Sequence, residues 1–230
     1  MTSRELPEQD CDPLWGYQSA GETRWLACGA VVVALLLQWR LPEKLSLGPA
    51  WLLPVLEGVM LAILMIGNPA KLHAVTRDMR PVALSMVALM SGTNAVSLFL
   101  LIHNLLKGST ETKNGRPLIY SAVSIWFTAV IAFALWFWEI DRGGPVKRCQ
   151  SERDAPDFLF TQMSSPAVTK AQWAPTFIDY LYLSLTNSTA FSPTDVLPLT
   201  SRAKILMGLQ SVASLATIAV VGARAVNILS

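Results

Sequence analysis

Five runs of apolar residues, separated by short polar stretches, dominate this chain. The runs cover residues 25–39, 51–67, 82–106, 118–138 and 205–229. A helix needs about 20 apolar residues to cross a hydrocarbon layer of roughly 30 Å. The last three runs meet this length, and the first two lie at its lower limit. The pattern therefore predicts about five transmembrane helices.

A sixth apolar stretch is too short to cross a bilayer. Residues 180–185 are apolar, and small or hydroxyl-bearing residues follow them, then Pro193, Asp195 and Pro198. Backbone that is not helical must, at membrane depth, be buried in protein or line a water-filled cavity. We therefore expect residues 177–186 to form a re-entrant, pore-type half-helix that dips into the membrane.

Composition places the chain in the same class. Of its 230 residues, 52% are apolar and 15% are charged, which is more apolar than an average soluble domain. Tryptophans stand at the ends of the first two runs, and Trp136, Trp138 and Trp173 repeat this placement, which is typical of indole rings at the membrane interface. The expected fold class is all-α: a polytopic helical membrane protein whose first partner is the lipid bilayer.

The polar stretches divide the chain into four parts. Residues 1–24 form a polar, acidic segment without the basic region of a secretory signal. Residues 25–106 form a three-helix membrane region, and residues 107–117 are a linker rich in turn formers. The fourth part, residues 118–230, contains a helix at 118–138, a surface loop at 141–174, the half-helix, a loop at 187–200 and a helix at 203–229.

Several kinds of chemistry find no support in the sequence. Cys11, Cys28 and Cys149 are widely spaced and suggest neither a zinc site nor a disulfide framework. His73 and His103 have no neighbouring nucleophile or metal-ligand pattern. We therefore expect that the protein is not an enzyme and binds no cofactor. The net charge of +2 comes from scattered basic residues, which give no stripe suited to nucleic acid.

Four polar residues interrupt the apolar runs: Glu57, Asn94, Gln210 and Arg224. A charge at the bilayer centre costs at least ~2.5 kcal/mol, so it normally has a partner or a cavity. Glu57 needs a partner or a bound proton, whereas Arg224 is close enough to the chain end to reach the interface. The small residues around Asn94 indicate a close helix contact, with a substrate ligand as the alternative. Gln210 lies among the small residues of the last run.

The loop after the half-helix carries a family resemblance. Its centre consists of Thr189, Ala190, Phe191, Ser192, Pro193, Thr194 and Asp195. This segment aligns without a gap with T-T-V-G-Y-G-D, and Pro198 and Thr200 match the proline and threonine that follow that pattern. Together with the order helix, loop, half-helix, helix, it resembles the pore domain of the potassium-channel superfamily. The resemblance implies a homo-oligomer, a tetramer if channel-like, that passes monovalent cations.

The departures from that pattern change the expected selectivity. Ser192 and Thr194 replace the two filter glycines, and Pro193 replaces the tyrosine with a fixed φ. A stack of carbonyl sites for potassium is therefore not expected. One hypothesis is a weakly selective cation channel with Asp195 at its mouth. The alternative is a non-conducting membrane scaffold or accessory subunit in which the half-helix is a packing plug.

Location and orientation complete the expectations. The chain as a whole resembles uncharacterised bacterial inner-membrane proteins, which implies an integral protein of the bacterial plasma membrane. The distribution of Lys and Arg favours a cytoplasmic N-terminus, whereas a channel-like pore loop that enters from outside requires the opposite orientation. The sequence leaves this conflict open.

Overall fold

The computed structural model describes residues 24–46, 48–67, 79–107, 115–150, 155–165, 173–190 and 195–229, without side-chain detail at 67, 115–116, 149–150 and 223–229. Most of these residues are helical, which confirms the predicted all-α class. The helices are α1 (Trp25–Trp39), α2 (Leu52–Gly67), α3 (Arg80–Leu106), α5 (Gly115–Ile140), α6 (Pro145–Gln150), α7 (Thr161–Ser164), α8 (Phe177–Ala190) and α9 (Ser201–Leu229). Short elements complete the fold: the 3-10 turns η1 (Glu43–Leu45) and η2 (Asp141–Gly143), and the strands β1 (Phe158–Phe160) and β2 (Val196–Pro198).

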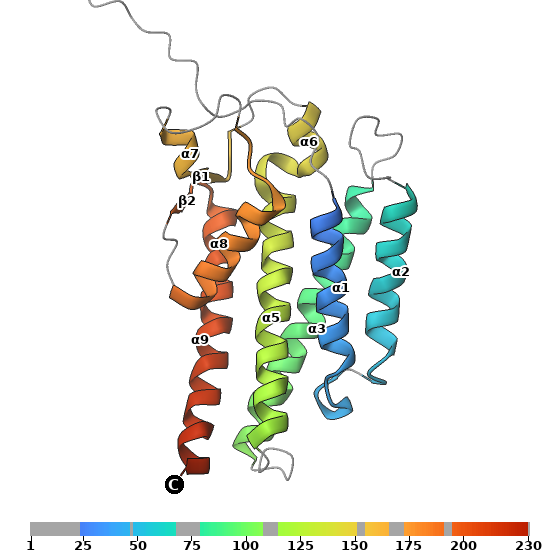
Figure 1. The fold of residues 1–230 in the computed structure, drawn as a ribbon, viewed down its shortest axis with the longest axis vertical. Helices are drawn as coiled ribbons and strands as arrows, with labels where there is room; N and C mark the ends of the chain where they lie inside the picture. The colour runs from blue at the N-terminus through green and yellow to red at the C-terminus, as the bar shows by residue number, and fades with distance from the viewer. Residues whose placement is uncertain are drawn as a thin grey trace, which may run out of the picture.

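Five long helices run alternately up and down, with α5 in the middle of the bundle (Figure 1). Helix α5 packs against α1, α3, α8 and α9. Helices α3, α5 and α9 are long and apolar enough to cross a membrane. Helices α1 and α2 have 15 and 16 residues, which at ~1.5 Å per residue is somewhat less than a hydrocarbon layer. Three long apolar helices are compatible with an integral membrane protein.

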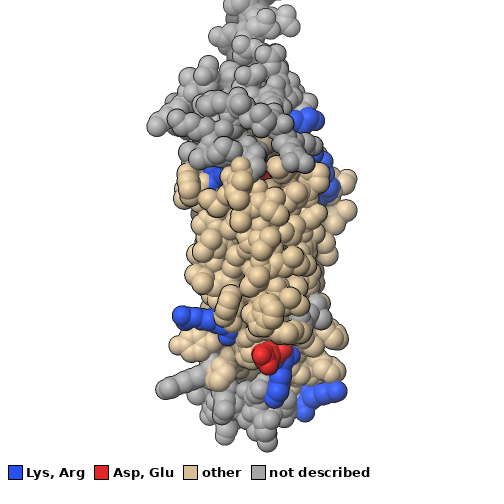
Figure 2. All heavy atoms as spheres, turned by 90° about the vertical axis from the view of Figure 1, so that its right-hand side faces the viewer, with Lys and Arg blue, Asp and Glu red and all other residues tan. Residues whose placement is uncertain are grey.

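The outer surface agrees with this class. Large apolar side chains are exposed along α1, α2 and α9, including Leu36, Val59 and Val212, which are 61%, 51% and 68% exposed. Seen from the side of α2, a band without charged residues separates Lys, Arg, Asp and Glu residues at the two ends (Figure 2). A surface of this kind is suited to hydrocarbon in the middle and to polar surroundings at the ends.

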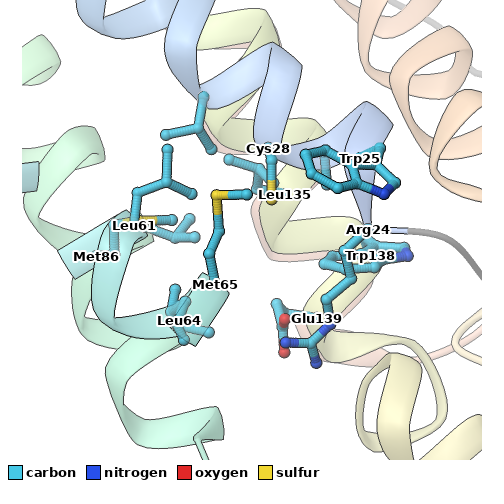
Figure 3. Close-up of a pocket in the computed structure, with 14 residues that line it drawn as sticks. Arg24, Trp25, Cys28, Leu61, Leu64, Met65, Met86, Leu135, Trp138 and Glu139 are labelled. Carbon is cyan, nitrogen blue, oxygen red and sulfur yellow. The ribbon is translucent and has the colours of Figure 1, made fainter. Parts of the chain in front are cut away.

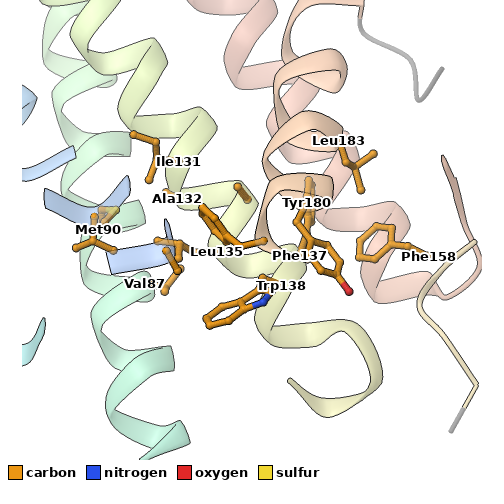
Figure 4. Packing of buried hydrophobic residues seen from close by; sticks show 14 of the residues in the cluster. Val87, Met90, Ile131, Ala132, Leu135, Phe137, Trp138, Phe158, Tyr180 and Leu183 are labelled. Carbon is orange, nitrogen blue, oxygen red and sulfur yellow. The ribbon is translucent and has the colours of Figure 1, made fainter. Parts of the chain in front are cut away.

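The core is centred on α5. Val87 and Met90 of α3 approach one side of α5, while the rings of Phe158 and Tyr180 gather around Phe137 on the other (Figure 4). The Phe137 and Phe158 rings meet edge to face, with centroids 5.2 Å apart. Such aromatic pairs add about 0.5–1.5 kcal/mol beyond the area they bury. This packing matters because lipid tails are as apolar as leucine, so burial alone does not hold helices together in a membrane.

The segment predicted as a surface loop, residues 141–174, is partly buried. Asp141, Asp157 and Phe158 have no exposed area. Strand β1 pairs antiparallel with β2, with Phe158 opposite Pro198, and this pairing holds the segment against α8 and α5. Elements of three or four residues have no measurable periodicity, so the apolar pattern along the chain could not reveal them.

Helix α8 ends four residues later than predicted, at Ala190. At its start, the Thr176 backbone N–H donates to Asp179 Oδ2 at 2.7 Å, as in a capping box. Near its end, the Thr186 and Thr189 hydroxyls donate to carbonyls of the preceding turn. These bonds satisfy the hydroxyls inside the helix, so the polar residues extend α8 instead of opening a loop. Helix α8 is not continuous with α9, because β2 lies between them.

Candidate functional site

The filter-like residues are only partly described. Phe191, Ser192, Pro193 and Thr194 lie outside the described residues. Thr189 and Ala190 form the exposed last turn of α8.

Asp195 is exposed and is hydrogen-bonded to two other residues, Thr161 and Tyr182. Its backbone carbonyl accepts from Thr161 Oγ1 at 2.8 Å, and its Oδ2 lies 3.3 Å from the Tyr182 hydroxyl. These contacts link the end of the filter-like loop to α7 and α8. The carboxylate stays exposed despite these contacts, so its negative charge can still attract cations.

Gln210 of α9 is the centre of a buried polar network on α8. Its Nε2 donates to the Ser184 carbonyl at 2.9 Å and to Ser188 Oγ at 2.6 Å, and its Oε1 accepts from Asn187 Nδ2 at 2.9 Å. The Ser184 hydroxyl donates to the Val130 carbonyl of α5 at 2.7 Å. The network fastens α8 to both neighbouring helices. The polar face of α8 therefore packs against α5 and α9 of the same chain.

A second buried network joins the C-terminal end of α5 to the N-terminal ends of α8 and α9. Asp141 has no exposed area and accepts from the Tyr180 hydroxyl at 2.5 Å and from the Asp157 N–H at 2.7 Å. The Arg148 guanidinium is almost fully buried, lies 5.3 Å from the centroid of the Tyr180 ring, and donates to the Trp138 and Asp141 carbonyls. This carboxylate therefore gathers three segments that are distant in sequence.

Asp157 connects this network to α9. The Arg202 guanidinium binds it through two nitrogens, at 2.6 and 2.7 Å, and the Thr200 hydroxyl donates to it at 2.5 Å. Bidentate pairs of this kind fix orientation as well as adding energy. Because Arg202 is the second residue of α9, the pair sets where α9 begins relative to β1.

The turn after α5 requires glycine. Arg142, Gly143 and Gly144 all have positive φ, and Gly144 has φ 99° and ψ 170°. Only glycine adopts this last conformation routinely. A Cβ at Gly144 would also stand 3.1 Å from Glu139 Oε2 and 3.2 Å from the Glu139 carbonyl oxygen. The turn thus directs the chain back over the end of α5.

Replacing Gly144 by alanine is expected to lower the free energy of unfolding by about 1–3 kcal/mol, the range for strained backbone conformations. The measurement is denaturant unfolding of purified protein in mild detergent. Gly29→Ala is the matched control, because Gly29 lies in α1 with nothing within 4 Å of its added Cβ. Alanine there should be neutral or stabilising. Equal stability of the two variants would contradict the role given to the turn.

Glu57 is the most unusual polar residue among the first three helices. It has no exposed area, and its neighbours are Gln38 of α1 and Thr93 of α3. The Thr93 hydroxyl donates to the Met90 carbonyl at 2.9 Å and lies 3.4 Å from Glu57 Oε1. A hydroxyl has a single proton. That proton is shared between the Met90 carbonyl and Glu57 Oε1, and the longer distance makes the hydrogen bond to Glu57 the weaker of the two.

The surrounding polar atoms are incompletely bonded. Glu57 Oε2, Gln38 Nε2 and Asn94 Oδ1 are buried and have no hydrogen-bond partner within the described residues. Buried polar atoms without partners are rare in native proteins and call for an explanation such as water, an ion or a transferable proton. The sequence indicated Glu57 and Asn94 as polar residues in two different apolar runs. The fold brings them into one polar cluster with Gln38, Thr93 and Ser97.

A small cavity adjoins this polar cluster. Its volume is about 20 Å³, and Gln38, Ser46, Thr93, Asn94 and Ser97 provide its polar lining. A cavity of roughly 10–15 Å³ holds one water molecule if polar groups surround it. Since Ser46 belongs to the connection between α1 and α2, the cavity extends from Thr93, beside Glu57, toward one end of the bundle.

A larger cavity lies on the other side of Glu57. It has a volume of about 280 Å³ and is bounded by α1, α2, α3 and α5, with Arg24 and Glu139 at one end (Figure 3). Its lining includes Leu61, one turn beyond Glu57 along α2. The fully buried Met90 lies on α3 between the residues that line this cavity and those that line the small one.

The other predicted polar residues have different positions. Arg224 lies in α9, and its side chain is outside the described residues. Gln38 was missed, although it is the one uncharged polar side chain within the first apolar run, and that interruption was the available signal. Cys28 lines the larger cavity and is a free thiol.

Comparison with protein-family models, with curated proteins and with solved structures finds no significant match for this chain.

Proposed function

We propose that this protein moves a monovalent cation across the membrane, that the cation is the proton, and that Glu57 binds it. The observation that supports the proposal best is the position of Glu57: it is fully buried, accepts only a long hydrogen bond from Thr93, and its Oε2 has no hydrogen-bond partner within the described residues. Ionisable residues inside membrane helices commonly belong to proton or ion pathways.

The two cavities add support. The small polar cavity has room for a water molecule that can pass a proton to the cluster, and the larger cavity lies beyond Glu57 toward the opposite end of the bundle. Between them, Met90 and Ala34 are fully buried. Access to Glu57 from both ends therefore requires a change in this packed layer, as in proteins that expose one site to two sides alternately.

The proposal also assigns which helices cross the membrane. Helices α1, α2, α3, α5 and α9 each cross the membrane, and α8 is re-entrant, entering from the end at which α9 begins. The up-and-down order of the five helices in Figure 1 and the return of the chain through β2 support this topology. The exposed apolar face of α9, which includes Ile205, Leu209 and Val212, is available to lipid or to a second copy of the chain.

Reconstitution into liposomes tests the proposal. Purified protein in vesicles with an imposed pH gradient should accelerate proton entry, followed with an internal pH dye, relative to empty vesicles. Sodium and potassium uptake are measured in parallel. Metal-ion uptake without proton uptake would overturn the assignment of the proton, and the absence of all three fluxes would favour the scaffold alternative.

A pore at α8 is the second candidate, because Asp195 is exposed beside a half-helix in the order found in channel pore domains. If four such carboxylates ring a mouth, Asp195→Asn should lower cation flux by about tenfold at ~0.01 M salt, where screening is weak. The protein should stay folded, and the effect should fade at high salt. Unchanged flux with a lower melting temperature would instead assign Asp195 to tethering the loop through Tyr182 and Thr161.

A further inference from the structure

The larger cavity has the features of a site for an amphiphile. Its walls are almost entirely apolar, with contributions from Ala27 and Val31 of α1, Leu61 and Leu64 of α2, and Met86 of α3. Its volume of about 280 Å³ is well above the roughly 150 Å³ of an apolar cavity that binds benzene. Water is poorly accommodated in such an apolar space. An alkyl chain fits it in both size and chemistry.

The mouth of the cavity faces the surroundings of the bundle. Trp25 and Met65 line it and are 61% and 38% exposed. Figure 3 shows Met65 between α1 and α2, and Trp25 and Cys28 on the α1 side of the cavity. Neighbouring outward side chains on these helices, such as Leu26 and Ile66, are also exposed and apolar. The cavity therefore opens toward the surface that a bilayer would cover.

One end of the cavity is charged. Arg24 and Glu139 line that end, and Arg24, Arg80 and Arg148 lie within electrostatic range of Glu139. Arg24 Nε is buried and has no hydrogen-bond partner within the described part of the chain. Guanidinium groups bind phosphate oxygens well. Arg148 also has the carboxylate of Asp141 beside it. Arg24 and Arg80, however, share the single carboxylate of Glu139, so an anionic head group is favoured there.

We infer that this cavity binds an acyl chain of an anionic membrane phospholipid, with the phosphate group at Arg24. An alkyl chain in the apolar part and a phosphate beside an arginine at the membrane interface match the two ends of the site. The phospholipid is available in the bilayer itself, so the site needs no soluble ligand. This binding is independent of proton movement through Glu57.

Native mass spectrometry in mild detergent tests the inference. The intact protein is mixed with equal amounts of phosphatidylglycerol and phosphatidylcholine of identical chains. We expect one phosphatidylglycerol per chain to be retained, about tenfold more strongly than phosphatidylcholine. Arg24→Gln should remove that preference. Equal retention of the two lipids by the unmodified protein would overturn the assignment of the head group.

A matched pair of variants tests the position of the acyl chain. Cys28→Phe places a ring in the cavity, whereas Gly29→Phe places the same ring on the exposed face of the same helix. Lipid retention should fall about tenfold in Cys28→Phe and not in Gly29→Phe. Melting temperatures establish that both variants are folded. Should both variants retain lipid equally, the lipid lies outside the cavity, and the inference is wrong.

Should neither lipid be retained by the unmodified protein, the inference also fails. None of these readouts depends on proton flux. Failure of the lipid site and failure of the proposed function are therefore distinguishable.

Discussion

Replacing Glu57 by glutamine should reduce proton uptake into proteoliposomes by about a hundredfold or more, the typical contribution of a positioned proton-transfer group. Glutamine has nearly the same shape and its amide oxygen can still accept from Thr93, but it cannot bind and release a proton near neutral pH. The measurement is the initial rate of internal acidification under a fixed pH gradient. Glu43→Gln is the matched control, since Glu43 is exposed on η1.

Stability separates a functional Glu57 from a structural one. In Glu57→Leu, the Thr93 hydroxyl keeps its bond to the Met90 carbonyl, so removing the carboxyl leaves no newly unpaired donor. A buried polar group replaced by an apolar one of similar size is then often neutral or stabilising. We expect proton uptake to be lost while the melting temperature is unchanged or higher. A large loss of stability in Glu57→Gln with normal uptake would refute the proposal.

Replacing Asp141 by alanine should lower the free energy of unfolding by about 3–5 kcal/mol, the usual cost of breaking a buried pair by removing one partner. The change removes the acceptor of the Tyr180 hydroxyl and of the Asp157 N–H, both of which are buried. It also leaves the positive charge of Arg148 beside Tyr180 without this carboxylate. The measurement is unfolding by added denaturant in mild detergent.

Asp179→Ala provides the control for the loss of a carboxylate. Asp179 accepts from Thr176 at the start of α8, where removal of such a capping contact costs about 1 kcal/mol. Asp141→Asn should fall between the two, because the amide oxygen can still accept one hydrogen bond. If Asp141→Ala is no less stable than Asp179→Ala, the buried network does not hold the C-terminal end of α5 and the N-terminal ends of α8 and α9 together.

The long helices could be predicted closely from the sequence. Helix α1 has the predicted bounds, and α2, α3 and α9 begin or end within a few residues of theirs. Runs of apolar residues are sufficient for this, because a helix satisfies its own backbone hydrogen bonds and needs only an apolar surface to lie in lipid. The prediction of Glu57, Asn94 and Gln210 as polar residues inside the apolar runs rests on the same simple pattern.

The partners of those residues came only from the tertiary structure. Gln210 meets Ser184, Asn187 and Ser188 because α8 and α9 pack together over more than 20 positions of sequence separation. Likewise, the buried segment at Asp157 depends on the pairing of β1 with β2, whose partner residues are 36 to 40 positions further along the chain. No local pattern encodes such distances.

The sequence by itself determined that this chain is helical, apolar over five long runs and interrupted by a few costly polar residues. Only the tertiary structure decided that Glu57 shares a cluster with Gln38 and Asn94, and that four helices leave a cavity with Arg24 at its end. The physical reason is the range of the interactions. Helix formation is local, whereas cavities and polar networks depend on which faces of distant helices come into contact.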